Sequence, residues 1–216
     1  MSRTLTVATL FPLATVAAAD EANARALVRR GAARDLTVET VTVDRADSFV
    51  AADVYDAAEA VPDRAYDIVY TGTGALNWLP DVERWAEVAA SLVAPGGFLY
   101  LAEFHPLTDV LDDETGSRVL HDYFARDAWV DITPGTYADL EAETVHNRSV
   151  EWQHPVGEVV SAIAAAGLRI DFLHEHEASL FPRYGTLRRD DNGYYRFPPN
   201  RARIPLMYSI RATRPS

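Results

Sequence analysis

The sequence contains no cysteine and no lysine, and all 20 of its basic residues are arginine. Without cysteine the chain has no disulfide and no thiolate metal site. Without lysine it has neither a Schiff-base lysine nor the lysine of a phosphate-binding P-loop. Long apolar runs are missing as well, since none reaches the roughly 18 residues that a membrane-spanning helix needs. These absences exclude several classes of enzyme and predict a chain that does not cross a membrane.

Positive charge is scarce relative to negative charge, so that the formal net charge is -12 at pH 7. A chain this acidic is a poor non-specific ligand for nucleic acid or for an anionic membrane surface. The sequence therefore predicts a small-molecule substrate as the partner, with no nucleic acid and no membrane.

Glycine is scarce in the N-terminal third, where Gly31 is the only glycine among the first 70 residues. Residues 1–22 hold one arginine, a moderately apolar stretch and three consecutive alanines, a pattern that resembles a weak secretory signal. The threonines and the proline inside that stretch favour the alternative, a strand over residues 4–10. We interpret the segment as part of a cytoplasmic domain.

Apolar periodicity divides the chain into alternating strands and helices. The helix that begins near Pro80 is expected to end at Pro95, with Gly96 and Gly97 available for a left-handed cap. Asn192 and Gly193 form the strongest short hairpin signal. The other expected helices cover 20–35 and 157–167, and the strands cover 4–10, 36–44, 66–72, 98–104, 168–176 and 204–213, with a short one in 48–56 that ends near Asp53.

This alternation predicts an α/β fold with a mostly parallel sheet, helices on both faces and an antiparallel C-terminal strand. The length of 216 residues and the 48% hydrophobic content fit a single domain, residues 1–216. Residues 1–47 form a shortened, divergent N-terminal part. Two irregular segments, 106–156 and 178–203, are expected as insertions on the substrate side, because such sheets bind ligands at the carboxyl ends of their strands.

Three stretches together resemble the class I S-adenosylmethionine-dependent methyltransferases, whose fold is Rossmann-like. They cover the third to fifth strands of that family, the helix after the fourth strand and the C-terminal helix–strand unit. The stretches read "FVAADVYDA", "YDIVYTGTGALNWLPDVERWAEVAASLVAPGGFLYLAEFHP" and "HNRSVEWQHPVGEVVSAIAAAGLRIDFLHEHE". The resemblance implies a methyltransferase that uses S-adenosylmethionine to methylate a small molecule.

The resemblance also implies a cofactor site. Asp53 matches the acid that receives the adenine amino group, with Val54 on the adenine face, and Asp44 matches the ribose-binding acid. The loop after the fourth strand, which lies under the methionine part, corresponds to Thr71, Gly72, Gly74 and Leu76.

The sequence departs from the family at its glycine-rich loop. The G-x-G-x-G motif that should follow the first strand is absent, and Phe11, Pro12 and Leu13 stand in its place. Only eight residues separate Asp44 from Asp53, which leaves no room for the usual intervening helix. A second interpretation is therefore a non-catalytic relative that keeps the sheet and serves as a binding or oligomer subunit.

Two titratable residues end the predicted strand 98–104 and are the candidate catalytic groups. His105 is a candidate general base, because imidazole titrates near neutral pH. Glu103 is a candidate for orienting the substrate. The alternatives are that His105 only caps the strand end and that Glu103 is a hydrogen-bonded acid that stabilises the loop.

Candidate substrate-binding residues come from the two insertions. His146, Glu151 and His154 lie in a polar stretch that is alternatively a plain loop anchored by Trp152. Arg183 and Tyr184 lie in an arginine- and tyrosine-rich excursion that suits a substrate carboxylate or phosphate. Its alternative is a solvated hairpin with arginine pairs to Asp190 and Asp191.

The "HEHE" stretch at 174–177 raises a third and weakest interpretation, a metal-dependent hydrolase. Strand periodicity places His174 and His176 on one face, where they could join His105 in a metal site. No third ligand is evident nearby in the sequence, so no metal is predicted. A shortened N-terminal part would also leave a sheet edge exposed, which predicts a homodimer.

Overall fold

The computed structural model describes residues 7–10, 52–61, 65–133 and 147–216 of the chain. Several predictions fall outside these ranges. They are the helix at 20–35, the strand at 36–44, the segment that replaces the glycine-rich loop, Asp44 and His146.

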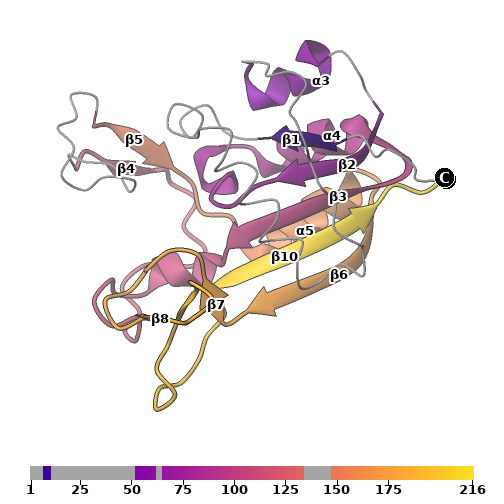
Figure 1. Cartoon of the computed structure of the whole chain (residues 1–216). Coiled ribbons are helices and arrows are strands. Elements are labelled where there is room, and N and C mark those ends of the chain that lie inside the picture. Colours follow the sequence, from indigo (N-terminus) through magenta and orange to yellow (C-terminus); the bar gives the residue numbers. More distant parts are fainter. Residues whose placement is uncertain (1–6, 11–51, 62–64, 134–146) are drawn as a thin grey trace.

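The core of the fold is a five-stranded sheet with the strand order β1-β2-β3-β10-β6 (Figure 1). β1 pairs parallel with β2, and β2 pairs parallel with β3, whereas β10 runs antiparallel to both β3 and β6. The bounds are β1 Val7–Leu10, β2 Tyr66–Thr71, β3 Val93–Phe104, β6 Arg169–His176 and β10 Met207–Thr213. The predicted α/β fold with an antiparallel C-terminal strand is confirmed.

The central strands are nearly continuous apolar runs because both of their faces are covered. Val69, Leu99 and Leu101 face the main core, and Tyr70 and Tyr100 stack on the opposite face with ring centroids 6.1 Å apart. A strand buried on both faces needs apolar side chains at successive positions, which removes the alternation seen in half-exposed strands. The central position predicted for residues 98–104 is therefore confirmed.

The two long helices, α4 (Val82–Leu92) and α5 (Val156–Ala165), pack against each other and on one face of the sheet. Asp81 caps α4 by accepting a 2.9 Å bond from the Arg84 amide. Its apolar stripe is buried as the helical periodicity predicts, and α5 stops before Gly167, whose φ is +86°. The buried residues of α4 are Val82, Trp85, Ala86, Ala89, Ala90 and Leu92.

The junction between α4 and β3 differs from the prediction. The helix ends at Leu92, and Pro95, Gly96 and Gly97 already belong to β3 rather than forming the cap. Gly96 has a φ of +77°. Gly97 lies so close to β2 that an added Cβ would sit 2.8 Å from the Asp67 carbonyl oxygen. The glycines are required by the close approach of two strands, which the local sequence does not reveal.

A short helical segment replaces the end of the strand expected near Asp53. The 3-10 helix η1 (Val54–Asp56) starts directly after it and continues into α3 (Ala57–Ala60). The Asp53 Oδ1 atom accepts a 2.9 Å hydrogen bond from the Tyr55 amide and so caps this turn. An aspartate at this position favours the turn over an extended chain.

The two excursions gather beyond the carboxyl ends of β2, β3 and β6 (Figure 1). Their own core consists of Leu111, Tyr184, Leu187, Phe197 and Leu206. The predicted turn at Asn192 and Gly193 joins β8 to β9, which confirms the hairpin. The short elements here are η3 Pro106–Val110, β4 Trp129–Asp131, β5 Ser149–Glu151, β7 Ala178–Ser179, β8 Arg188–Arg189 and β9 Tyr195–Arg196.

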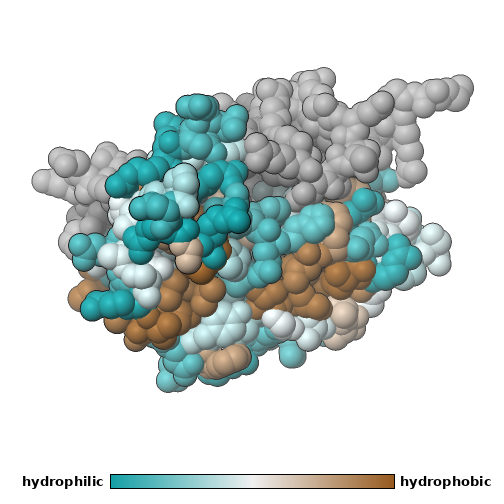
Figure 2. All heavy atoms as spheres, turned by 90° about the horizontal axis from the view of Figure 1, so that it is seen from below, coloured by the Kyte–Doolittle hydropathy of each residue, from teal (hydrophilic) through white to brown (hydrophobic). Residues whose placement is uncertain are grey.

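Apolar side chains on the surface lie in clusters. On the face shown in Figure 2, they collect in separate areas with polar surface between them. Among the described residues, no helix has both the length and the apolar character to cross a bilayer.

Candidate functional site

A buried carboxylate holds the loop that follows β2. Glu103 is 4% exposed, and its two oxygens accept hydrogen bonds from the amides of Gly74 (2.7 Å), Ala75 (2.6 Å) and Leu76 (3.1 Å). A fourth bond comes from the amide of Phe104 at 3.2 Å. These charge-assisted bonds fix the loop and the 3-10 helix η2 (Leu76–Trp78) that it enters. Glu103 therefore acts as the acid that stabilises the loop, which favours a positioning role over contact with the substrate.

Burial raises the pKa of Glu103 from its ordinary value of 4.5 to about 7, although its four amide donors act in the opposite direction. A carboxylate deep in a protein loses more hydration than these donors return. Its protonation state is therefore linked to the geometry of the loop beside it.

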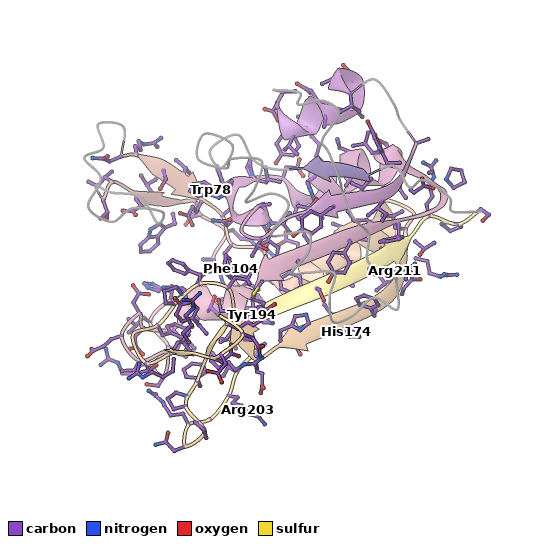
Figure 3. The ribbon with its side chains drawn as sticks, in the orientation of Figure 1. Trp78, Phe104, His174, Tyr194, Arg203 and Arg211 are labelled. Carbon is purple, nitrogen blue, oxygen red and sulfur yellow. The ribbon has the colours of Figure 1, made fainter. Side chains whose placement is uncertain are left out.

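The hydrogen bonds of Glu103 to residues 74–76 form a clamp on this loop. Within it, Gly74 has a φ of +75°, and an added Cβ there would lie 3.4 Å from the Phe104 ring. Phe104 and Trp78 come from β3 and η2, at the end of the sheet where the excursions begin (Figure 3). A side chain at position 74 would strain the backbone and crowd this ring.

The ring of His105 is occupied at both nitrogens. Its Nδ1 atom accepts a 3.1 Å hydrogen bond from the Leu107 amide and caps η3. The ring hydrogen is therefore on Nε2, which donates a 3.1 Å hydrogen bond to Glu175 Oε1. Burial lowers the pKa of His105, against the opposing effect of the Glu175 carboxylate. The strand-end cap is thus the role that the geometry shows, because a general base needs a free basic nitrogen.

The segment after β5 attaches the first excursion, residues 106–156, to the same loop. Glu151 accepts a 3.0 Å bond from Asn77 Nδ2, and the Trp152 amide donates to the Asn77 carbonyl oxygen at 2.8 Å. Next, His154 Nε2 donates to the Leu79 carbonyl oxygen at 2.7 Å. The structure thus brings Glu151 and His154 to the loop that Glu103 holds. Asn77, which sequence reasoning missed, is the link, and its only signal was a polar residue between Leu76 and Trp78.

Polar atoms without a hydrogen-bond partner concentrate at this loop. Five buried side-chain polar atoms of the described residues have none, and three of them belong to Thr71, Asn77 and His154. They are Thr71 Oγ1, Asn77 Oδ1 and His154 Nδ1. Since a buried polar atom without a partner costs about 1–3 kcal/mol, a ligand that supplies donors would be stabilised here. These atoms fit a polar group such as the amino-acid part of S-adenosylmethionine.

Asp53 and Val54 lie on η1, which is tied to the far end of the loop. The Tyr55 hydroxyl accepts a 2.9 Å bond from the amide of Asp81, the residue that caps α4. Val54 packs against the main core, and Leu76 is itself part of it. Asp53 is exposed and uses Oδ1 for its cap, so Oδ2 can accept the adenine amino group.

Arg183 and Tyr184 are engaged within the excursions. The Tyr184 hydroxyl donates to the Thr108 carbonyl oxygen at 2.8 Å, and its side chain is almost fully buried. Arg183 pairs with Asp113 at 2.6 Å and with Asp109 at 3.6 Å. Arg196 pairs with Asp190, as the alternative interpretation of a paired hairpin predicts, and also with Glu177. These contacts favour a structural role for the predicted substrate-binding pair.

The histidines of the "HEHE" stretch do not converge with His105. His174 stacks on Phe172 with ring centroids 4.3 Å apart, and His176 Nε2 lies 2.9 Å from Ser209 Oγ. His105 instead contacts Glu175, which alternates to the opposite face of β6. Within the described ranges no group of three or more potential ligands is close enough to hold a metal.

Comparisons with known proteins connect the chain to solved structures only. Neither a family model nor a curated protein matches the sequence. An S-adenosylmethionine-dependent methyltransferase from Clostridium acetobutylicum matches 99% of this chain and 76% of its own, at 8% identity and a TM-score of 0.52. A methyltransferase of the same description from Mesorhizobium loti matches 71% of this chain and 64% of its own, at 18% identity and a TM-score of 0.42.

The glycopeptide N-methyltransferase MtfA, solved with S-adenosylmethionine, matches 76% of this chain at 16% identity and a TM-score of 0.41. The chain spans less than two thirds of the length of this enzyme and of the Mesorhizobium loti one. At such low identity the likeness concerns the fold. The likeness to the Clostridium acetobutylicum enzyme, together with the strand order and the antiparallel strand β10 of the main sheet, shows that this chain has the fold of the class I S-adenosylmethionine-dependent methyltransferases.

Proposed function

We propose that this protein binds S-adenosylmethionine at the carboxyl ends of β1 and β2 and transfers its methyl group to a small-molecule acceptor. The observation that carries the proposal is the clamp of Glu103 on residues 74–76, which fixes the loop that underlies the methionine part of the cofactor in this fold. Open α/β sheets bind their ligands at this edge. A cytoplasmic location, predicted from the sequence, suits a soluble cofactor of this kind.

When bound, the cofactor supplies a methyl group that is already activated as part of a sulfonium ion. The protein then has to hold the two reactants in line and exclude water, which requires positioned side chains more than acid–base groups. Thr71 Oγ1 and Asn77 Oδ1 are buried and can accept hydrogen bonds from the amino-acid part. Asp53 Oδ2 would accept the bond from adenine.

His105 enters this proposal as a positioning residue. Its cap on η3 sets the start of the first excursion, the side from which an acceptor would approach. Loss of the cap should raise the KM of the acceptor more than it lowers kcat. A His105→Asn variant keeps a side-chain cap and should restore the KM, whereas His105→Ala should not.

The second candidate, a non-catalytic subunit, follows from the missing glycine-rich loop. Glycines let the backbone approach the cofactor closely, and bulky residues stand in their place. The two candidates differ in one measurable property, the binding of the cofactor.

Calorimetric titration with S-adenosylmethionine and S-adenosylhomocysteine tests the proposal. We expect saturable binding at micromolar ligand that weakens at least tenfold in Asp53→Asn, which preserves the helix cap but replaces an acceptor oxygen by an amide. Asp56→Asn, on the same turn, should bind normally. Thr71→Val, which removes the hydroxyl and keeps the shape, should also weaken binding. A folded protein that gives no heat at millimolar cofactor would support the non-catalytic alternative.

A further inference from the structure

Asn77 of η2 is bonded to the end of β5 through only one of its two side-chain polar atoms. Its Nδ2 atom donates a 3.0 Å hydrogen bond to Glu151 Oε2, and its backbone carbonyl oxygen accepts a 2.8 Å bond from the Trp152 amide. The Oδ1 atom is buried and has no hydrogen-bond partner among the described residues. Asn77 is therefore held at its backbone and at Nδ2, while its Oδ1 acceptor is unused.

The carboxylate of Glu151 determines which end of the Asn77 amide is unused. The oxygen and the nitrogen of an amide are similar in size, so a half-turn exchanges them with little change in shape, and the hydrogen-bond network decides the orientation. An ionised carboxylate can only accept hydrogen bonds. The nitrogen therefore faces Glu151, because the reverse orientation would place two acceptors, Oδ1 and Oε2, against each other.

The backbone amides on either side of Asn77 are already bonded elsewhere. The amides of Ala75 and Leu76 donate to Glu103 Oε1. The Leu79 amide donates to the Leu76 carbonyl oxygen at 3.0 Å. A buried acceptor without a partner is destabilising, and a ligand that donates a hydrogen bond to it removes this cost. The unused Oδ1 atom thus favours a ligand that carries a donor group.

We propose that Glu151 is a positioning residue of the cofactor site, which fixes the Asn77 amide so that Oδ1 binds the ammonium group of S-adenosylmethionine. The bond from Nδ2 to a carboxylate polarises the amide and strengthens its oxygen as an acceptor. The negative charge of Glu151 behind the amide also favours a cationic ligand group over an anionic one. This role rests on the proposed function, since it concerns the same site.

Two ligands that differ at the amino-acid end test this role by calorimetric titration of the full chain. S-adenosylhomocysteine carries the ammonium group, and 5′-methylthioadenosine is the same nucleoside thioether without the amino-acid part. Glu151→Gln keeps the side-chain length but can turn either a donor or an acceptor toward Asn77. It should weaken S-adenosylhomocysteine about tenfold or more and change the affinity for 5′-methylthioadenosine less than about twofold. The matched control, Glu114→Gln in the same excursion, changes an exposed glutamate and should bind both ligands normally.

A double-mutant cycle separates positioning from direct contact. Asn77→Ala should weaken S-adenosylhomocysteine about as much as Glu151→Gln does, and the second change should add nothing to the first. Losses that add up would show that Glu151 contacts the ligand itself. Equal losses for both ligands would show that Glu151 only stabilises the loop. Either result overturns the positioning role.

The orientation of the Asn77 amide is also measurable by NMR without ligand. In the wild type one Nδ2 hydrogen should resonate downfield and exchange slowly with solvent, and Glu151→Gln should abolish both properties. Side-chain signals like those of the exposed Asn192 would overturn the inference. A wild type that binds neither ligand would refute the proposed function together with this role. A wild type that binds S-adenosylhomocysteine, with no loss in Glu151→Gln, would refute the positioning role alone.

Discussion

Two carboxylates each hold a different loop of this protein, and their surroundings shift their pKa values in opposite directions. Glu103 holds residues 74–76 at the end of β3, and Asp112 holds residues 115–118 in the first excursion. Both accept bonds from several backbone amides, and Asp112 also accepts one from the Thr115 hydroxyl. Yet burial raises the pKa of Glu103 to about 7, whereas the amides of Arg118, Ser117 and Thr115 strongly lower the pKa of Asp112.

The difference shows that the number of donors does not decide the charge state. At Asp112, which is only 6% exposed, the donors outweigh the lost hydration, so the anion is favoured. At Glu103, beneath the sheet edge, the lost hydration outweighs the donors. The excursion loop is therefore held by a carboxylate that stays ionised, and the loop of the candidate cofactor site is held by one that can be protonated near neutral pH.

The largest effect should come from Glu103→Ala. The change leaves three loop amides without an acceptor, two of them buried, so we expect the free energy of unfolding to fall by about 3 kcal/mol. Binding of S-adenosylhomocysteine should weaken at least tenfold, because the loop loses its fixed geometry. Urea denaturation and calorimetry measure the two effects.

The control for this change is Glu87→Ala, which removes an exposed glutamate from α4. It should leave both the unfolding free energy and the affinity near their wild-type values. A Glu103→Ala protein that is less stable but binds the ligand normally would contradict the link between the clamp and the site.

The pH dependence of stability should separate the two carboxylates. Because the folded-state pKa of Glu103 is raised, the folded protein takes up a proton between pH 7 and 4.5 that the unfolded chain does not. The wild type should gain up to about 3 kcal/mol relative to Glu103→Gln as the pH falls through this window. A difference in unfolding free energy that stays constant with pH would show that the carboxylate remains ionised.

Asp112→Asn should behave in the opposite way. The folded-state pKa of Asp112 is lowered, so its stabilising contribution is present at neutral pH and is lost only as the pH falls below 3.8. At pH 7 we expect a fall in Tm that is smaller than that of Glu103→Ala, with unchanged ligand affinity. Thermal scans at pH 7 and pH 3 measure the contrast, and a variant that loses ligand affinity would show that the two loops are coupled.

Tyr184→Phe should have the smallest effect. It removes the hydrogen bond to the Thr108 carbonyl oxygen from the core of the excursions and should cost about 1 kcal/mol. Normal acceptor kinetics would agree with its structural role. A raised KM would instead support the predicted contact with the substrate.

The sheet and its two long helices were predictable from the sequence because their signals are local. Apolar runs mark β2 and β3, the stripe of α4 follows from its helical spacing, and Asn192–Gly193 marks a hairpin. Errors arose where a long-range approach intervened. Gly97 looked like a helix cap because the contact with β2 that requires it is invisible in a short window.

The candidate site was predictable as a place but not as a set of roles. The strand ends at Glu103 and His105 were recognised, yet neither the amide clamp nor the cap on η3 could be read from their neighbours. Asn77 was missed because its importance depends on Glu151, 74 residues later in the chain. The missing glycine-rich loop was evident from composition, and its structural consequence lies outside the described residues.

The sequence by itself determined the class of fold, the exclusion of thiol and lysine chemistry, and which side chains stand at the ends of the central strands. Only the tertiary structure decided what those side chains do. Residue type fixes how many hydrogen bonds a group can make and which charge it can carry, but burial and partners determine which state is stable. For Glu103 the decisive partners lie up to 29 residues away and for His105 70 residues away, distances that only folding brings together.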